Sequence, residues 1–121
     1  MTGITLRSQS LLPLPLPLPS TPGGRRDWAG LPDCGHALGL AGLRGANTDF
    51  WLVLVPTVAS AEALESELRY YLSGAPRIAL LPDTEVLPYD TFSPHQDLIS
   101  RRLTVLRDVA TGKIDTLILA A

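Results

Sequence analysis

Three short apolar runs divide the second half of the chain. The first, Phe50 to Val55, is nearly continuous and is closed by Pro56, a pattern typical of a strand buried on both faces. Residues 78–81 and 115–121 form two further runs, rich in isoleucine, leucine and alanine. The pattern therefore predicts three buried strands.

The stretches between these runs carry apolar residues at helical spacing. The first stretch covers residues 60–72, with Ser60 as its N-cap. The second covers residues 93–110, where Ser93-Pro94-His95-Gln96 is typical of a capping box with proline at the first helical position, and Gly112 ends it. The two predicted apolar faces are Ala61, Leu64, Leu68, Tyr71 and Leu72, and Leu98, Ile99, Leu103, Leu106, Val109 and Ala110.

Strands separated by single helices define the expected fold class, α/β. Right-handed crossovers turn this βαβαβ order into a three-layer unit with a parallel sheet. Residues 33–43 carry a weaker helical pattern, because each of their three glycines costs a helix about 1 kcal/mol relative to alanine. A parallel sheet that ends on an uncovered strand predicts an incomplete domain with an exposed apolar face or edge, and hence self-association.

The first 27 residues differ from the rest in composition. Leucine alternates with proline from Leu11 to Pro19, which favours a polyproline-II conformation and is far below the ~20 apolar residues of a membrane span. Residues 20–26 are typical of a flexible joint. We expect residues 1–27 to be a disordered leader, with docking into a proline-binding groove as the alternative. The folded part is expected to cover residues 28–121.

Composition and motif content narrow the function classes. The 121 residues carry a formal net charge of −2, so a nucleic-acid contact would have to be local. Cys34 is the only cysteine, which suits a reducing compartment, and a cytoplasmic location is expected. No G-x-x-x-x-G-K-[ST] loop is present and Lys113 is the only lysine, so ATP chemistry is not expected of this chain alone. Cys34, His36 and His95 do not stand at recognised ligand spacings, and we expect no metal or cofactor.

One dense stretch, residues 87–102, follows the second predicted strand. It lies at the carboxyl edge of the predicted sheet, where α/β folds of this kind place function. Pro88 and Pro94 stiffen it. Tyr89 and Phe92 form either a plug that seals the corner between strand and helix or a stacking platform for a base.

Charged residues around this stretch have two interpretations. Arg101, Arg102 and Arg107 form either a solvated helix face or contacts to phosphate groups or a protein partner. Acidic residues near helix starts more often interact favourably with the helix macrodipole than take part in acid–base catalysis. No catalytic pair is therefore predicted. The acids concerned are Asp83, Glu85, Asp90 and Asp97.

The same stretch resembles the signature of a known family. Leu87 to Leu103 reads L-P-Y-D-x-F-S-P-H-x-D-x-x-S-x-R-L, and Leu81 to Val109 looks like the signature region of the bacterial transcription-repair coupling factors. Val55-Pro56-Thr57, leading into Ala63 to Leu68, is similar to the strand–helix unit after the phosphate loop of superfamily 2 helicases. The corner that carries the signature consists of Leu87, Pro88, Tyr89, Asp90, Phe92, Ser93, Pro94 and His95.

The resemblance implies a fold. Residues 28–121 would be the start of a module similar to the excinuclease B subunit, a degenerate helicase-like half-domain related to P-loop NTPases that lacks a working phosphate loop. In the excinuclease B subunit the corresponding loop leads into a tyrosine-rich hairpin that grips DNA. Here Tyr89 is the only tyrosine in that loop, which argues against direct recognition of damage by this segment.

The resemblance also implies a function. The family is an ATP-dependent DNA translocase that displaces stalled RNA polymerase and recruits excision repair; its motor, with ATP and Mg²⁺, would lie past Ala121. Its expected partners are the excinuclease A subunit, RNA polymerase and DNA. We therefore expect this chain to be a non-catalytic scaffolding or interaction module, with direct contact to the DNA backbone as the alternative.

Overall fold

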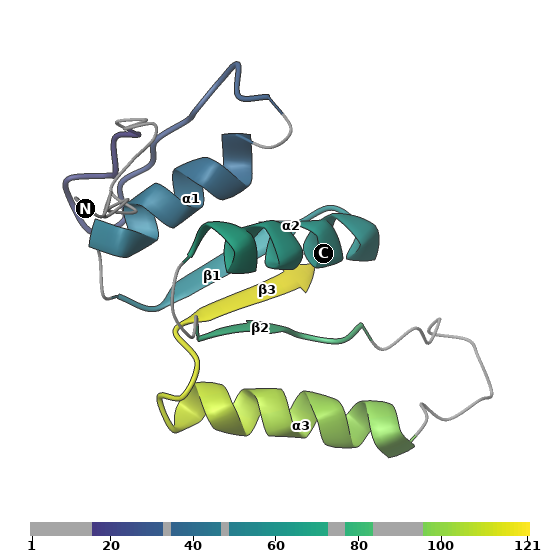
Figure 1. The fold of residues 1–121 in the computed structure, drawn as a ribbon. Helices are drawn as coiled ribbons and strands as arrows, with labels where there is room; N and C mark the ends of the chain where they lie inside the picture. The colour runs from purple at the N-terminus through teal and green to yellow at the C-terminus, as the bar shows by residue number, and fades with distance from the viewer. Residues whose placement is uncertain (1–15, 33–34, 47–48, 73–76, 84–95) are drawn as a thin grey trace, which may run out of the picture.

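The computed structural model describes residues 16–32, 35–46, 49–72, 77–83 and 96–121 (Figure 1). Within them the predicted alternation of strands and helices is confirmed, and the weak pattern near residue 35 is also a helix. The elements in chain order are α1 (Gly35–Ala46), β1 (Trp51–Val55), α2 (Val58–Tyr71), β2 (Ile78–Leu80), α3 (Gln96–Ala110) and β3 (Thr116–Ala120).

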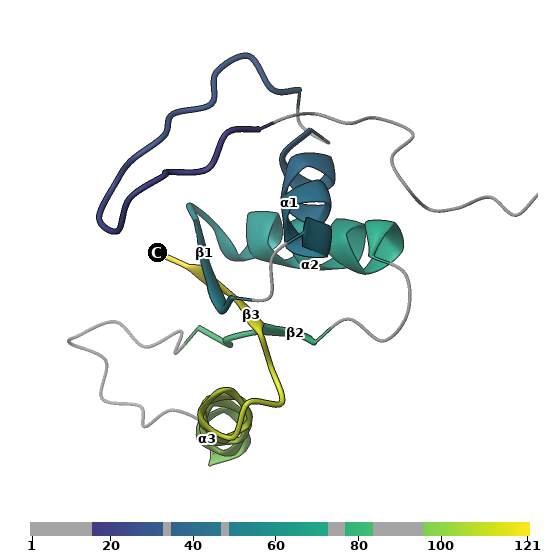
Figure 2. The ribbon, with the colours of Figure 1, turned by 90° about the vertical axis from the view of Figure 1, so that its left-hand side faces the viewer.

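The three strands form one parallel sheet in the order β1-β3-β2. The last strand along the chain is therefore the central one, with Ile118 opposite Val53 on one side and Leu80 on the other. The chain steps from β1 to β2 in one direction and back to β3 in the other. Crossovers of one hand then place α2 and α3 on opposite faces of the sheet, as Figures 1 and 2 show.

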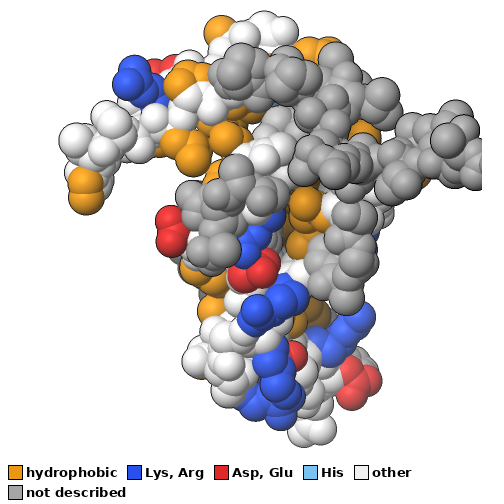
Figure 3. Space-filling model, turned by 60° about the vertical axis from the view of Figure 1, so that its left-hand side comes forward, with side chains coloured by type: hydrophobic (Ala, Val, Ile, Leu, Met, Phe, Trp, Pro, Cys, Tyr) orange, Lys and Arg blue, Asp and Glu red, His pale blue; other side chains and the backbone are white. Residues whose placement is uncertain are grey.

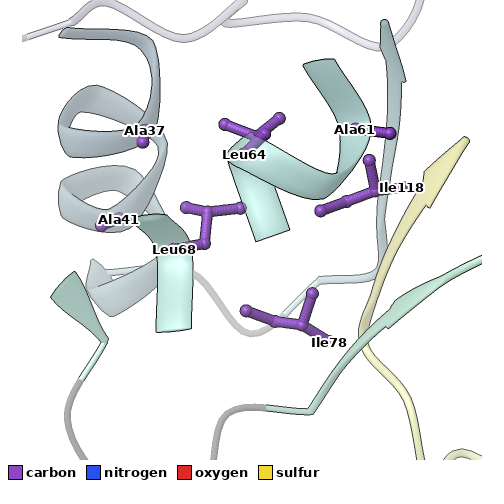
Figure 4. Close-up of a cluster of buried hydrophobic side chains, with 7 residues drawn as sticks. All are labelled: Ala37, Ala41, Ala61, Leu64, Leu68, Ile78 and Ile118. Atoms are coloured by element: carbon purple, nitrogen blue, oxygen red, sulfur yellow. The ribbon is translucent and has the colours of Figure 1, made fainter. Parts of the chain in front are cut away.

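The core lies between the sheet and the paired helices α1 and α2. Leu68 and Ile118 are its largest fully buried side chains. Alanines on α1 allow that helix to approach α2 closely, so the core is small but continuous (Figure 4). Its members are Ala37, Ala41, Ala61, Leu64, Leu68, Ile78 and Ile118.

The start of α2 differs from the prediction. Thr57, not Ser60, is the N-cap, and its Oγ1 accepts a hydrogen bond from the backbone N–H of Ser60 at 3.1 Å. Both residues have a side-chain oxygen that could cap the helix. Thr57 has an extended backbone and α2 begins at the next residue, Val58, so Thr57 is the cap. Tyr71, predicted on the buried face of α2, is exposed, whereas the other members of that face are buried or half-buried.

The end of α3 agrees with the prediction. Gly112 has a positive φ of 73°, the left-handed conformation that glycine adopts without strain. The next N–H, of Lys113, returns to the carbonyl of Asp108 at 2.8 Å. This closing pattern satisfies one of the last carbonyls of the helix.

Burial on the α3 side of the sheet is lower than predicted. Leu52 and Leu54 are 56% and 61% exposed, so the prediction that the first strand is buried on both faces is wrong. The predicted apolar stripe of α3 contains no buried residue, and Leu103 is 61% exposed. The reason is the strand order: β1 is an edge strand, and α3 lies toward the β2 side of the sheet (Figures 1 and 2).

The described part of the leader, residues 16–27, contains neither helix nor strand. The indole N–H of Trp28 donates to the carbonyl of Pro17 at 3.1 Å. Residues 1–15 lie outside the described residues, so the expected disorder of the leader stays a prediction.

Substitutions at two glycines of α1 test the contact between this helix and Leu16 of the leader. A methyl group at Gly39 would collide with the side chain of Leu16, whereas one at Gly42 would meet open space. Gly42→Ala is expected to raise the free energy of unfolding by about 0.5–1 kcal/mol, because alanine is the better helix former. Gly39→Ala is expected to raise it less, because Leu16 must be displaced. Urea unfolding followed by circular dichroism measures both, and equal gains would contradict the contact.

Candidate interaction surface

Most of the predicted site lies outside the described residues. The whole signature corner lies outside them. The two interpretations of Tyr89 and Phe92, as a plug at the corner or as a stacking platform, therefore stay predictions. The capping box before α3 lies outside the described residues as well. The undescribed corner residues are Leu87, Pro88, Tyr89, Asp90, Phe92, Ser93, Pro94 and His95.

Arg102 has a structural contact. Its guanidinium donates a hydrogen bond to the carbonyl oxygen of Pro82, and its side chain is half-buried. Pro82 follows the end of β2, so this bond ties α3 to the carboxyl edge of the sheet. The group is therefore oriented toward its own chain.

Arg101 and Arg107 lie on other sides of α3. With ~100° between successive residues, Arg101, Arg102 and Arg107 are spread around the helix more than ~90° apart. Arg101 is exposed, and Arg107 is exposed and pairs with Asp108 at 3.2 Å. The three arginines therefore do not form one face of the helix, although the sequence grouped them.

Arg69 and Arg77 form a basic group at the amino edge of the sheet, which the sequence analysis did not identify. Arg77 donates from Nε to the carbonyl of Lys113 at 2.9 Å. Arg69, at the end of α2, donates to the carbonyl of Ile78 at 2.8 Å and pairs with Glu65 at 3.0 Å. Figure 3 shows basic and acidic side chains side by side over this part of the surface. The charge of Arg69 is compensated by Glu65, and a cation in the last turn of a helix interacts favourably with the helix macrodipole.

A groove of about 560 Å³ lies between α1, β1 and α2. Its polar lining residues are His36, Ser60 and Glu67. The described residues that line it include no lysine or arginine that could neutralise a phosphate, although the groove adjoins Val55 at the carboxyl end of β1. Within the described ranges, no three His, Cys, Asp or Glu side chains lie close enough to hold a metal ion. None of the helices in those ranges has the length and apolar character needed to cross a membrane.

The described residues thus define a small α/β domain with a parallel three-stranded sheet between helices. No family model matches the chain. It is 39% identical over 77 residues to the transcription-repair-coupling factor of Haemophilus influenzae, 37% over 67 residues to that of Escherichia coli, and 36% over 83 residues to that of Myxococcus xanthus. The resemblance predicted from the sequence is confirmed: over these residues the chain is similar to transcription-repair-coupling factors.

The matches are short relative to those proteins. They cover 64%, 55% and 64% of this chain, but only 6%, 6% and 7% of the three relatives. The chain therefore spans a small part of the length of the relatives it matches.

Proposed function

We propose that this chain is a non-catalytic amino-terminal module of a transcription-coupled DNA repair factor. The observation that carries the proposal is the similarity to three transcription-repair-coupling factors from different bacteria over more than half of the chain. In this proposal the chain acts in the cytoplasm as an interaction scaffold. RNA polymerase, DNA and the excinuclease A subunit are partners of the whole repair factor.

The sheet is proposed to be a degenerate helicase-like half-domain. Its parallel strands and the helix that begins just after Pro56 support this assignment. Two features support the absence of catalysis by the chain itself: the sequence has no phosphate-binding loop, and the described residues that line the groove beside Val55 include no lysine or arginine. ATP and Mg²⁺ would belong to the motor of the whole factor.

A chimaera tests the proposed role. This chain would replace the segment that it matches in the Escherichia coli relative, and repair of the transcribed strand would be measured in cells that lack the native factor. The chimaera is expected to restore preferential repair of that strand, whereas the same factor with the segment deleted is not. A chimaera no better than the deletion, at equal protein level, would overturn the proposal.

The purified chain tests the absence of catalysis. ATP hydrolysis by the chain is expected to equal that of buffer, with and without DNA, because it has neither the loop nor the lysine that cradle the phosphates. Turnover that co-purifies with the chain and scales with its concentration would instead support a free-standing enzyme.

A further inference from the structure

The described part of the leader folds back on itself beside α1. Residues 16–32 form a loop that extends away from this helix and returns toward it, as Figure 2 shows. At the tip of the loop the N–H of Gly24 donates to the carbonyl of Thr21 at 3.0 Å. Pro22 and Gly23, which has a φ of 75°, are the residue types that fit the two central positions of a type II turn. This turn brings the chain back past its own proline-rich segment.

Gly39 provides the space on α1 that the leader fills. It lies two residues from both Ala37 and Ala41, about 200° around the helix, and therefore on the side opposite the core. Gly39 is nevertheless buried, and a methyl group there would overlap with Cδ1 of Leu16. The missing side chain thus creates a notch that a leucine methyl group enters. A methyl group at Gly42, on the same helix, would meet nothing within 4 Å, so the notch is local.

Trp28 contacts the next residue of the leader. Its indole N–H donates to the carbonyl oxygen of Pro17 at 3.1 Å, and Trp28 is half-buried. A buried indole N–H usually has an acceptor, and aromatic side chains are the usual receptors of proline-rich segments. The notch and the indole therefore contact two consecutive residues, Leu16 and Pro17, from two separate places in the chain.

The contacted segment is stiff before it docks. Pro17 and Pro19 restrict their own φ, and each keeps the leucine before it in the extended region. Residues 16–19 accordingly contain neither helix nor strand. Little conformational entropy is lost when such a segment docks, so two small contacts are enough to hold it.

We propose that the notch at Gly39 and the indole of Trp28 form a binding site for an extended leucine–proline dipeptide, and that the leader is its ligand within the same chain. The site recognises two features of the ligand. One is an apolar side chain that fits the notch, and the other is the carbonyl oxygen of the following residue.

The leader carries this ligand four times. Leucine precedes proline at positions 12–13, 14–15, 16–17 and 18–19. A displacement by two residues, about 6 Å along a polyproline-II helix, presents the same pair of residues again. In this proposal any of the four dipeptides can occupy the site, so the leader stays bound when one of them is altered. The 11 positions between Pro17 and Trp28 act as a short tether that keeps the repeat at high effective concentration.

The site does not depend on the proposed repair role. Its test follows one proton of the purified full chain, whereas the repair role is tested in cells. Failure of one leaves the other unaffected.

Nuclear magnetic resonance of the full chain is the first measurement, because the indole N–H of Trp28 gives its own signal. The sequence has two tryptophans, and Trp51→Phe assigns the two signals. Gly39→Ala is expected to accelerate exchange of the Trp28 indole proton with water roughly three- to tenfold, the factor that a hydrogen bond of ordinary net strength supplies. Gly42→Ala is the matched control on the same helix and is expected to leave the rate within about twofold. An unchanged Trp51 signal shows that the fold is retained.

Changes in the leader test the repeat. Leu16→Ala is expected to leave the exchange rate of the Trp28 indole proton within about twofold, because a neighbouring dipeptide takes its place. Replacement of the four leucines at positions 12, 14, 16 and 18 by alanine is expected to accelerate exchange as much as Gly39→Ala does. An acceleration by Leu16→Ala alone that equals that of the four-alanine chain would overturn the equivalence of the four dipeptides.

A synthetic peptide with the sequence of residues 8–22 tests the site with a ligand supplied from outside. It is added to the four-alanine chain up to about 1 mM, the effective concentration of a short tether. Slow exchange of the Trp28 indole proton is expected to return, and the same peptide with alanine at the four leucine positions is expected to have no effect. Equal exchange in Gly39→Ala and Gly42→Ala, or an equal response to the two peptides, would overturn the proposal.

Discussion

Replacement of Ile118 by alanine is expected to lower the free energy of unfolding by about 2–5 kcal/mol. Ile118 is 0% exposed, lies on the central strand, and is one of the two largest fully buried side chains. Its removal would leave a cavity between the sheet and α2, in the same cluster as Leu64 and Leu68. The domain is small, so a loss of this size is a large fraction of its total stability.

Urea unfolding followed by circular dichroism measures this loss, with two variants as references. Ile118→Val removes one methyl group and is expected to cost about 0.5–1.5 kcal/mol. Leu52→Ala, on the exposed edge of the same sheet, is expected to cost less than ~1 kcal/mol at concentrations where the chain is monomeric. If Leu52→Ala costs as much as Ile118→Ala, the core is not where the structure places it.

Loss of the ion pair between Arg44 and Asp115 is expected to have the second largest effect, about 1–3 kcal/mol for Arg44→Ala. Nη2 of Arg44 lies 2.8 Å from Oδ2 of Asp115, and the two side chains are 13% and 25% exposed. Arg44 also donates to the carbonyl of Asp49. One guanidinium therefore joins the end of α1, the approach to β1 and the start of β3.

A double-mutant cycle separates this pairing from the loss of each side chain alone. Arg44→Ala and Asp115→Asn are expected to cost less together than the sum of the two single changes, because either change already removes the same ion pair. Arg25→Ala provides the contrast, since Arg25 and its partner Asp27 are 85% and 77% exposed and their pair is expected to contribute almost nothing. Additive costs at positions 44 and 115 would show that the two groups do not stabilise one another.

Local signals predicted the elements well. Helical spacing identified α2 and α3, and Gly112 marked the end of α3, because these features depend on residues within one or two turns. The N-cap of α2 was misassigned within four residues that contain both Thr57 and Ser60. Two residues of the preferred type that lie only three positions apart cannot be ranked without the backbone conformation.

The order of the strands and the contacts between distant residues could be predicted less well from the sequence. The run of apolar residues in β1 indicated a strand but not its position, since edge and central strands of a parallel sheet have similar composition. The exposure of Leu52 and Leu54 follows from the strand order, which only tertiary packing decides. The contact between Arg77 and Lys113 spans 36 positions of sequence and carries no local signal. The similarity to transcription-repair-coupling factors, in contrast, was visible in one string of residues.

The central position of β3 also dictates when the sheet can assemble during synthesis. β1 and β2 emerge from the ribosome first, but they are not neighbours, and every ladder hydrogen bond of the sheet involves β3. Until residues 116–120 are available, a nascent chain can form α1 and α2 but has no strand partner for either apolar run. The two ladders of the described sheet therefore form only after residues 116–120 have been synthesised, and the apolar runs of β1 and β2 stay without this strand partner until then.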